Sequence, residues 1–443
     1  MTEQHPPIRP KERAAIIQSL RAGVVPRVGL QHIAVGRASE VAAVLQDLQS
    51  ASDGGAAVRF IVGRFGSGKS FFLNLASAVA LEKRFLTTRV DITPDCRLHG
   101  SGGQARALFT ELMRNLSSKA RPDGGALAGV VERWISDVYQ QHVAAGLGEG
   151  AVEATIRERL RRLQELTGGF DLSAVLAKYF QGFRAGDAAL QQSALRWMRG
   201  EYGTKTEARQ DLGVRAIVDD ADIYDYLKLF AAFARMAGFA GLVVNIDELV
   251  VLSHRLASSK ARGANYETIL RILNDCLQSN VEGLIFLFGA TEEALEDPRR
   301  GLFSYEALAT RLATNEFARE GVVDLSGPVI RLKSLTKEDL FVLLMNIRQV
   351  FAGGDPAKYL LPDEGLQAYL DYCAHTLGDA YFRTPRDSIT RFVGFLSLLE
   401  QNPGISWQSM LGRMEDIQVA PAQSAELAPA VPDDGDDLAH FKL

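Results

Sequence analysis

The chain has 443 residues, enough for two to four domains, and its 47% hydrophobic and 23% charged residues exclude an intrinsically disordered protein. A formal net charge of −5 excludes a polycation that coats nucleic acid through bulk charge, although a local basic patch remains compatible with it. We expect a cytoplasmic protein that does not contact a membrane. The three cysteines are isolated, and the sequence has neither a signal-peptide pattern nor an apolar run of ~18 residues.

Short strand-like runs alternate with helical patterns over much of the chain. Apolar residues recur at helical spacing in segments 11–22, 39–48, 70–81, 104–116, 223–236 and 266–278. Short apolar runs, several of them rich in β-branched residues, predict buried strands over residues 58–62, 87–92, 242–246 and 284–288. This alternation predicts an α/β fold in which helices cover both faces of a parallel sheet.

Two further regions are helical by pattern. Strand patterns are nearly absent from residues 120–215, which predict a helical insertion with helices over 130–143, 151–166, 172–183 and 188–198. Helices over 337–351, 364–377 and 386–400 predict a C-terminal lid. The expected organisation is an N-terminal helical segment (1–34), a core in two parts (35–119 and 216–330) around the insertion, the lid (331–415) and a disordered acidic tail (416–443).

One motif carries specific chemistry: the pattern G-x-x-x-x-G-K-[ST] stands between the predicted strand 58–62 and the predicted helix 70–81. Its glycines let backbone N–H groups turn toward phosphate oxygens, and the helix that follows adds the positive end of its dipole. Lys69 would reach the β- and γ-phosphates of ATP, and the Ser70 hydroxyl would bind Mg²⁺. The predicted phosphate-binding loop, or P-loop, consists of Gly63, Arg64, Phe65, Gly66, Ser67, Gly68, Lys69 and Ser70.

An acidic pair, Asp247 and Glu248, follows the predicted strand 242–246. Asp247 would hold the Mg²⁺ shell and Glu248 would polarise an attacking water, so the pair indicates ATP hydrolysis. Strand 284–288 leads to Thr291, whose hydroxyl would orient that water. Glu292 and Glu293 are rival candidates for this role, and Thr291 would otherwise serve only to cap the next helix.

Two arginines in helical segments are further candidates. Pro385 suits a first helical turn and places Arg386 at a helix start, from which its guanidinium would reach the γ-phosphate. Arg311 lies in the helical segment 305–312. The alternative for both is an ordinary solvated arginine.

In this order the motifs resemble those of the AAA+ ATPases, especially the initiator clade related to Orc/Cdc6. The resemblance makes Asp247 and Glu248 the Walker B pair. It places Thr291 at the sensor-1 position, Arg311 in the arginine-finger region and Arg386 at the sensor-2 position.

A closer resemblance within this group covers residues 10–400. The segment V-G-R-x-x-E, which contains Gly36 and Arg37, is similar to the segment that packs near the adenine. The chain resembles the BrxD-like ATP-binding proteins of BREX phage-exclusion loci. The further segments that carry this resemblance are G-V-V-P at 23–26, the P-loop followed by Phe71, the Gly-Ala-Thr segment and segment 304–312. The resemblance implies a prokaryotic defence or DNA-transaction ATPase, often encoded beside a helicase-like partner.

Two functions are compatible with these features. The first is an AAA+ ATPase that uses ATP and Mg²⁺ and assembles into a homo-oligomer, with an arginine from one subunit completing the site of its neighbour. The alternative is a slow ATP-gated scaffold that recruits a helicase or nuclease through the insertion.

DNA is a possible partner of the insertion, which contains two basic clusters. The alternative is that these side chains lie on solvated helix faces among acids such as Glu153, Glu158 and Glu165. The basic residues are Arg157, Arg159, Arg161 and Arg162 in one cluster, and Arg196, Arg199, Lys205 and Arg209 in the other.

Overall fold

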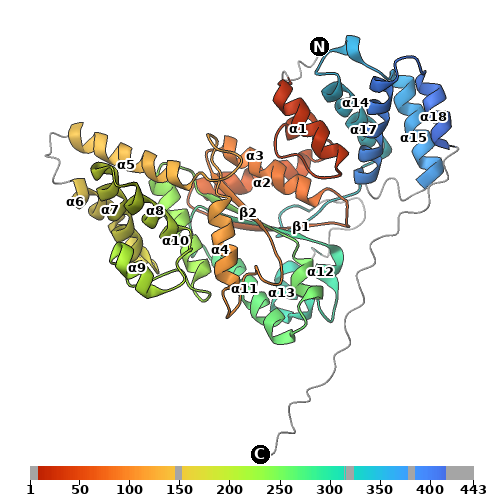
Figure 1. Cartoon of the computed structure of the whole chain (residues 1–443). Helices are drawn as coiled ribbons and strands as arrows, with labels where there is room; N and C mark the ends of the chain where they lie inside the picture. The colour runs from red at the N-terminus through yellow and green to blue at the C-terminus, as the bar shows by residue number, and fades with distance from the viewer. Residues whose placement is uncertain (1–7, 145–151, 314, 316–323, 378–384, 416–443) are drawn as a thin grey trace, which may run out of the picture.

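The computed structural model describes residues 8–144, 152–313, 315, 324–377 and 385–415. A parallel sheet forms the middle of the molecule, the insertion extends from one end of it, and the C-terminal helices lie at the other end (Figure 1). The predicted mixed α/β architecture is therefore confirmed. The expected tail, 416–443, lies outside the described residues.

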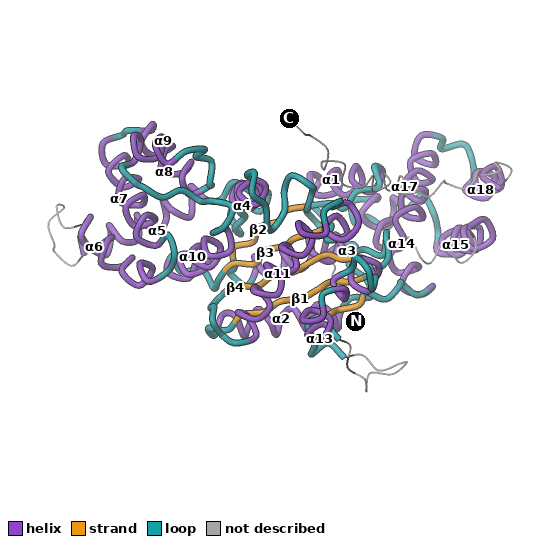
Figure 2. The backbone as a smooth tube through the Cα atoms, turned by 90° about the horizontal axis from the view of Figure 1, so that it is seen from below, coloured by secondary structure: helices purple, strands orange, loops and turns teal. Residues whose placement is uncertain are grey.

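In the described part of the chain the sheet has five parallel strands in the order β2-β3-β4-β1-β5, and the first four of these lie side by side in Figure 2. The strands are β1 (Ala56–Val62), β2 (Leu86–Asp91), β3 (Leu242–Asp247), β4 (Leu284–Ala290) and β5 (Val329–Arg331). In this order β4 lies between β1 and β3, so the loops after these three strands emerge next to one another at the carboxyl edge. Ligands of open parallel sheets bind at this edge.

Alternate side chains of the central strands pack on opposite faces of the sheet. Ile285 and Leu287 pack with helices α2 (Ala38–Ser52) and α3 (Lys69–Glu82) on one face. Phe286 and Phe288 belong to a separate cluster on the other face, beneath α4 (Gln104–Arg114), α10 (Ile223–Met236) and α11 (Ser259–Leu277). Burial on both faces explains why β3 and β4 are continuous apolar runs.

The insertion is continuous with the core beneath the second face of the sheet. Trp134 packs edge-on against Phe233 of α10, and Trp197 packs in the same way against Tyr226 of α10. Its helices are α5 (Leu127–Ala144), α6 (Val152–Arg159), α7 (Gly169–Ala185), α8 (Ala188–Met198) and α9 (Lys205–Leu212).

The C-terminal helices of the expected lid, which we call the lid below, are α14 (Lys337–Phe351), α15 (Asp363–Leu377), α17 (Pro385–Gln401) and α18 (Trp407–Glu415). The N-terminal helix α1 (Pro10–Arg21) packs against α14 and α17, far from it in sequence (Figure 1). Ile16 and Leu20 of α1 lie in one apolar cluster with Leu340 and Phe392 of the lid.

Several elements differ from the sequence-based expectations. The edge strand β5 and helices α9 and α18 were not among the predicted elements. Helix α11 begins at Ser259, seven residues before the expected start, because the Ser258 side chain caps it by accepting from the N–H of Ala261. The expected helix 151–166 divides into α6 and a 3₁₀ segment, Leu160–Glu165. Within the described ranges, every helix is too short or too polar to cross a bilayer.

Candidate functional site

The P-loop joins β1 to α3 at the carboxyl edge of the sheet. Gly66 and Gly68 have φ angles of 78° and 94°, in the left-handed region that favours glycine. Helix α3 begins at Lys69, whose Nζ donates to the carbonyls of Gly63 (3.0 Å) and Arg64 (2.9 Å). Burial lowers the pKa of Lys69, and the charge of the nearby Arg386 lowers it further. The surrounding carboxylates act in the opposite direction but do not cancel this shift.

Asp247, the last residue of β3, lies directly beside the first turn of α3. The residue is 8% exposed, and its carboxylate accepts from the Ser70 hydroxyl at 2.6 Å. The other carboxylate oxygen accepts from the N–H of Glu248 at 2.9 Å. A Cβ at Gly289 of β4 would stand 2.0 Å from this oxygen, so only glycine leaves room for the carboxylate here.

Glu248 follows with a left-handed backbone, at φ 62°. Such a conformation costs a non-glycine residue about 1–3 kcal/mol and concentrates at functional sites. Partial burial, with the neighbouring Asp247 carboxylate as the next cause, raises the pKa of Glu248. The strained backbone projects a carboxyl group with a raised proton affinity into the cleft beside Lys69.

Asp91 is a further acidic residue at this edge, which the sequence reasoning missed. It ends β2 and lies in register with Asp247 on β3. Burial raises its pKa, and the Asp247 carboxylate raises it further. The available signal was its place next to the last residue of the predicted strand 87–92, but only the pairing of β2 with β3 reveals its neighbour.

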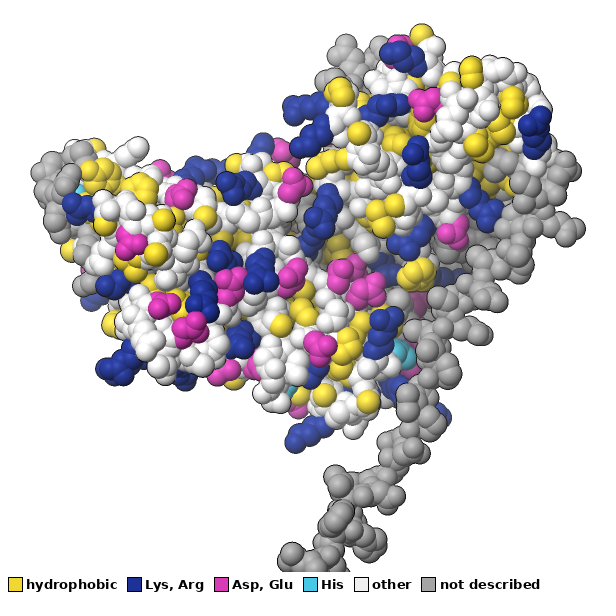
Figure 3. Space-filling model, viewed as in Figure 1, with side chains coloured by type: hydrophobic (Ala, Val, Ile, Leu, Met, Phe, Trp, Pro, Cys, Tyr) yellow, Lys and Arg dark blue, Asp and Glu magenta, His cyan; other side chains and the backbone are white. Residues whose placement is uncertain are grey.

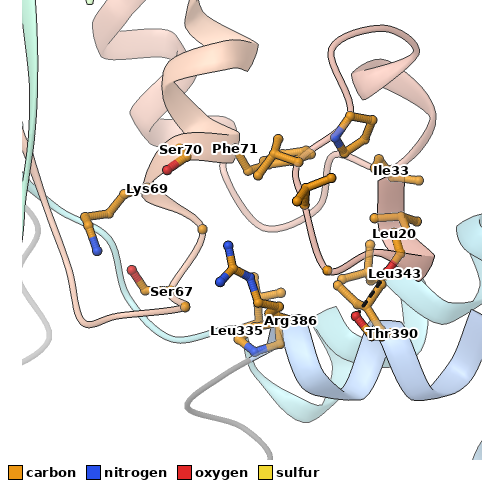
Figure 4. Close-up of a pocket in the computed structure, with 18 of the residues that line it drawn as sticks. Leu20, Ile33, Ser67, Lys69, Ser70, Phe71, Leu335, Leu343, Arg386 and Thr390 are labelled. Carbon is orange, nitrogen blue, oxygen red and sulfur yellow. Dashed lines mark hydrogen bonds between the residues drawn. The ribbon is translucent and has the colours of Figure 1, made fainter. Parts of the chain in front are cut away.

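A cleft of about 1090 Å³, its open mouth included, lies between the sheet edge and the lid. One part is apolar and is lined by Leu20, Val25, Pro26, Ile33, Val35, Leu335, Leu343, Ile347 and Ile389. The other part is polar and contains the P-loop from Phe65 to Ser70, together with Glu248 and Arg386. Figure 4 shows Arg386 pointing from the lid toward the P-loop. Such a cleft accommodates a ligand with a flat apolar part and an anionic part.

The lid contributes Arg386 at the predicted helix start, since α17 begins at Pro385. Its guanidinium lies 5.5 Å from the ring centroid of Phe65, which is 70% exposed at the tip of the P-loop. Phe71 also lines the cleft. Gly36 lies against Asp339 of α14, and Arg37 lines the cleft behind the P-loop.

Thr291 and Arg311 lie outside this cleft lining. Thr291 caps the short helix α12 (Glu292–Glu296), because its hydroxyl accepts from the N–H of Ala294 at 3.1 Å. Its rival Glu292 lies 3.4 Å from Arg64, and Glu293 lies 3.3 Å from His254. Arg311 is exposed on α13 (Glu306–Leu312), where it donates to the side chain of Asn274 at 2.7 Å.

On the face of the insertion seen in Figure 3, basic side chains are interspersed with acids. Arg196 lies 2.7 Å from Glu207 and Arg199 lies 3.1 Å from Glu201. Arg161 pairs with Glu158 at 3.6 Å. These ion pairs favour solvated helix faces over a phosphate-binding surface; the side chains of Arg157 and Arg162 lie outside the described part of the chain.

Comparison with protein families yields a match over most of the chain. The family model described as BREX system ATP-binding protein BrxC/D matches residues 8–415 of the chain. No curated protein and no solved structure matches it.

Proposed function

The chain belongs to the BREX system ATP-binding protein BrxC/D family, and we propose that it is an AAA+ ATPase that binds Mg²⁺ and ATP between the sheet and the lid and hydrolyses the ATP. The family supports an ATP-binding role in phage defence. The AAA+ core, the hydrolysis and the residue roles below are our proposals.

One observation carries the proposal: a single cleft contains both an apolar part and the P-loop with its surrounding charges. The adenine fits the apolar part, and the phosphates fit the loop at the start of α3. Ser67 supports this fit, because its hydroxyl is buried, with the residue 6% exposed, and has no hydrogen-bond partner among the described residues. The pair formed by Ser70 and Asp247 supplies the oxygen ligands that Mg²⁺ prefers.

Each residue has a distinct role in the proposed reaction. Lys69 would leave the loop carbonyls and bind the β- and γ-phosphates. Glu248 would accept the proton of a water that attacks the γ-phosphate, and Arg386 would stabilise the charge that develops there. Mg²⁺, when bound, neutralises phosphate charge. ATP and water become ADP and phosphate.

We extend the proposal to a homo-oligomer in which Arg311 acts on the site of a neighbouring subunit. This role suits its exposed position on α13, outside the cleft of its own chain. The proposal also includes a helicase-like partner, DNA as a possible ligand and a water-orienting role for Thr291.

Two substitutions test the proposal. Lys69→Ala should abolish binding of a fluorescent ATP analogue. Glu248→Gln should bind the analogue normally but hydrolyse ATP about 10²–10⁴-fold more slowly, as expected for loss of a general base. Gly263→Ala is the control, since a Cβ there meets no described atom within 4 Å. If Glu248→Gln turned over at the wild-type rate, the assignment of the base would be wrong. Slow wild-type turnover that DNA does not stimulate would favour the ATP-gated scaffold.

A further inference from the structure

Arg37 is a buried cation that touches three separate parts of the chain. It is 8% exposed and stands at the N-cap position of α2. Its Nη2 donates to the carbonyls of Ser67 (3.3 Å) and Lys333 (2.9 Å). Its Nη1 lies 3.5 Å from the Glu40 carboxylate, which partly offsets the cost of burying the charge.

The contact with Ser67 bears directly on the P-loop. A trans peptide is planar, so its carbonyl and the following N–H point in opposite directions. Holding the Ser67 carbonyl toward Arg37 therefore turns the N–H of Gly68 away from Arg37. Gly68 is the N-cap residue of α3, and the N–H groups at a helix start have no partner within the helix. Arg37 thus fixes the direction of a donor that suits phosphate.

The contact with Lys333 bears on the lid. Lys333 lies in the connector between β5 and α14, residues 332–336, through which the chain leaves the sheet for the lid. Asp339, in the first turn of α14, lies against Gly36, where a Cβ would stand 3.1 Å from its carboxylate. The attractive charge of Asp339 also acts on Arg37. One guanidinium therefore joins the P-loop to both the connector and the base of the lid.

We propose that Arg37 is a positioning residue that couples nucleotide occupancy of the P-loop to the position of the lid. This inference rests on the proposed function and gives Arg37 a role distinct from contact with the adenine. The planar fork of arginine presents several donors in fixed directions, which the single ammonium of lysine does not reproduce. Arg37→Lys keeps the charge beside Glu40 but loses the geometry.

Hydrogen exchange of the full chain, with and without Mg²⁺ and ADP, tests the coupling. In the wild type, ADP should slow exchange in the P-loop and also in residues 332–340. Arg37→Lys should bind ADP about tenfold or more weakly, as expected for lost hydrogen bonds to a charged group. At saturating ADP this variant should keep P-loop protection and lose the protection of 332–340.

Glu40→Gln is the matched control, because it removes the ion pair and leaves both carbonyl contacts of Arg37 in place. It should retain ADP-dependent protection of both segments. Protection of 332–340 that persists in Arg37→Lys, or that is absent in the wild type although its P-loop is protected, would overturn the coupling. The wild-type experiment can overturn the coupling even if the Arg37→Lys variant does not fold. No protection anywhere in the wild type would instead count against the proposed nucleotide site.

Discussion

At the scale of single residues, the position of Asp247 depends on the missing side chain of Gly289. A Cβ on Gly289 would collide with the Asp247 oxygen that accepts from Glu248, and it would displace the carboxylate from Ser70. We predict that Gly289→Ala lowers Mg²⁺-dependent ATP turnover about 100-fold, the usual size of the loss when a site is displaced by about 1 Å. Steady-state phosphate release measures the effect.

The control for this substitution must separate the site from general stability. Gly263→Ala adds the same methyl group on α11, where the new Cβ has no neighbour within 4 Å in the described part of the chain, and should leave turnover unchanged. Wild-type turnover in Gly289→Ala would show that the carboxylate need not occupy its observed position.

At the scale of elements, a buried ion pair joins α2 to the sheet. Arg59 of β1 donates two hydrogen bonds of 2.7 Å to Asp47 of α2. Arg59 also donates to the carbonyl of Leu325, ahead of β5, at 2.8 Å. We predict that Asp47→Ala lowers the free energy of unfolding by about 3–5 kcal/mol, because it leaves a buried charge without its partner.

Urea unfolding followed by circular dichroism measures this loss. The exposed pair formed by Lys119 and Glu82 provides the comparison, and Glu82→Ala should cost no more than about 1 kcal/mol. The double variant Arg59→Met with Asp47→Leu should recover much of the lost stability, since no buried charge is then left unpaired. An Asp47→Ala variant as stable as Glu82→Ala would contradict the structural role of the pair.

The elements also show how far the sequence determines the site. The positions of the P-loop after β1 and of the acidic pair at the carboxyl end of β3 were predictable, because each motif consists of contiguous residues at the end of a strand. The neighbour of Asp91 depends on the register between β2 and β3. Arg37 contacts the carbonyl of Lys333, which lies nearly three hundred positions later in the chain. Local patterns carry no such information. β5 is only three residues long and depends on pairing with β1, so it gave too short a pattern to predict.

At the scale of the whole molecule, the proposed action of Arg311 between subunits predicts that two inactive variants restore each other. Lys69→Ala retains Arg311 but has a damaged cleft, whereas Arg311→Ala retains the cleft. In a ring with head-to-tail contacts, mixing them in equal amounts should produce intact composite sites at about a quarter of the interfaces. ATP turnover of the mixture, compared with each variant alone, measures the recovery. Full activity of Arg311→Ala alone would contradict the role.

The packing of α1 on the lid has a consequence for biosynthesis. Ile16, Ile17 and Leu20 are buried against helices that begin about 320 residues later in the chain. At roughly 5–20 residues per second, a ribosome needs on the order of 15–60 s to deliver those helices. During that interval the apolar face of α1 has no native partner, and the cleft has no lid. The cleft is therefore among the last parts of the molecule to form, and a nascent chain acquires it only when the lid has left the ribosome.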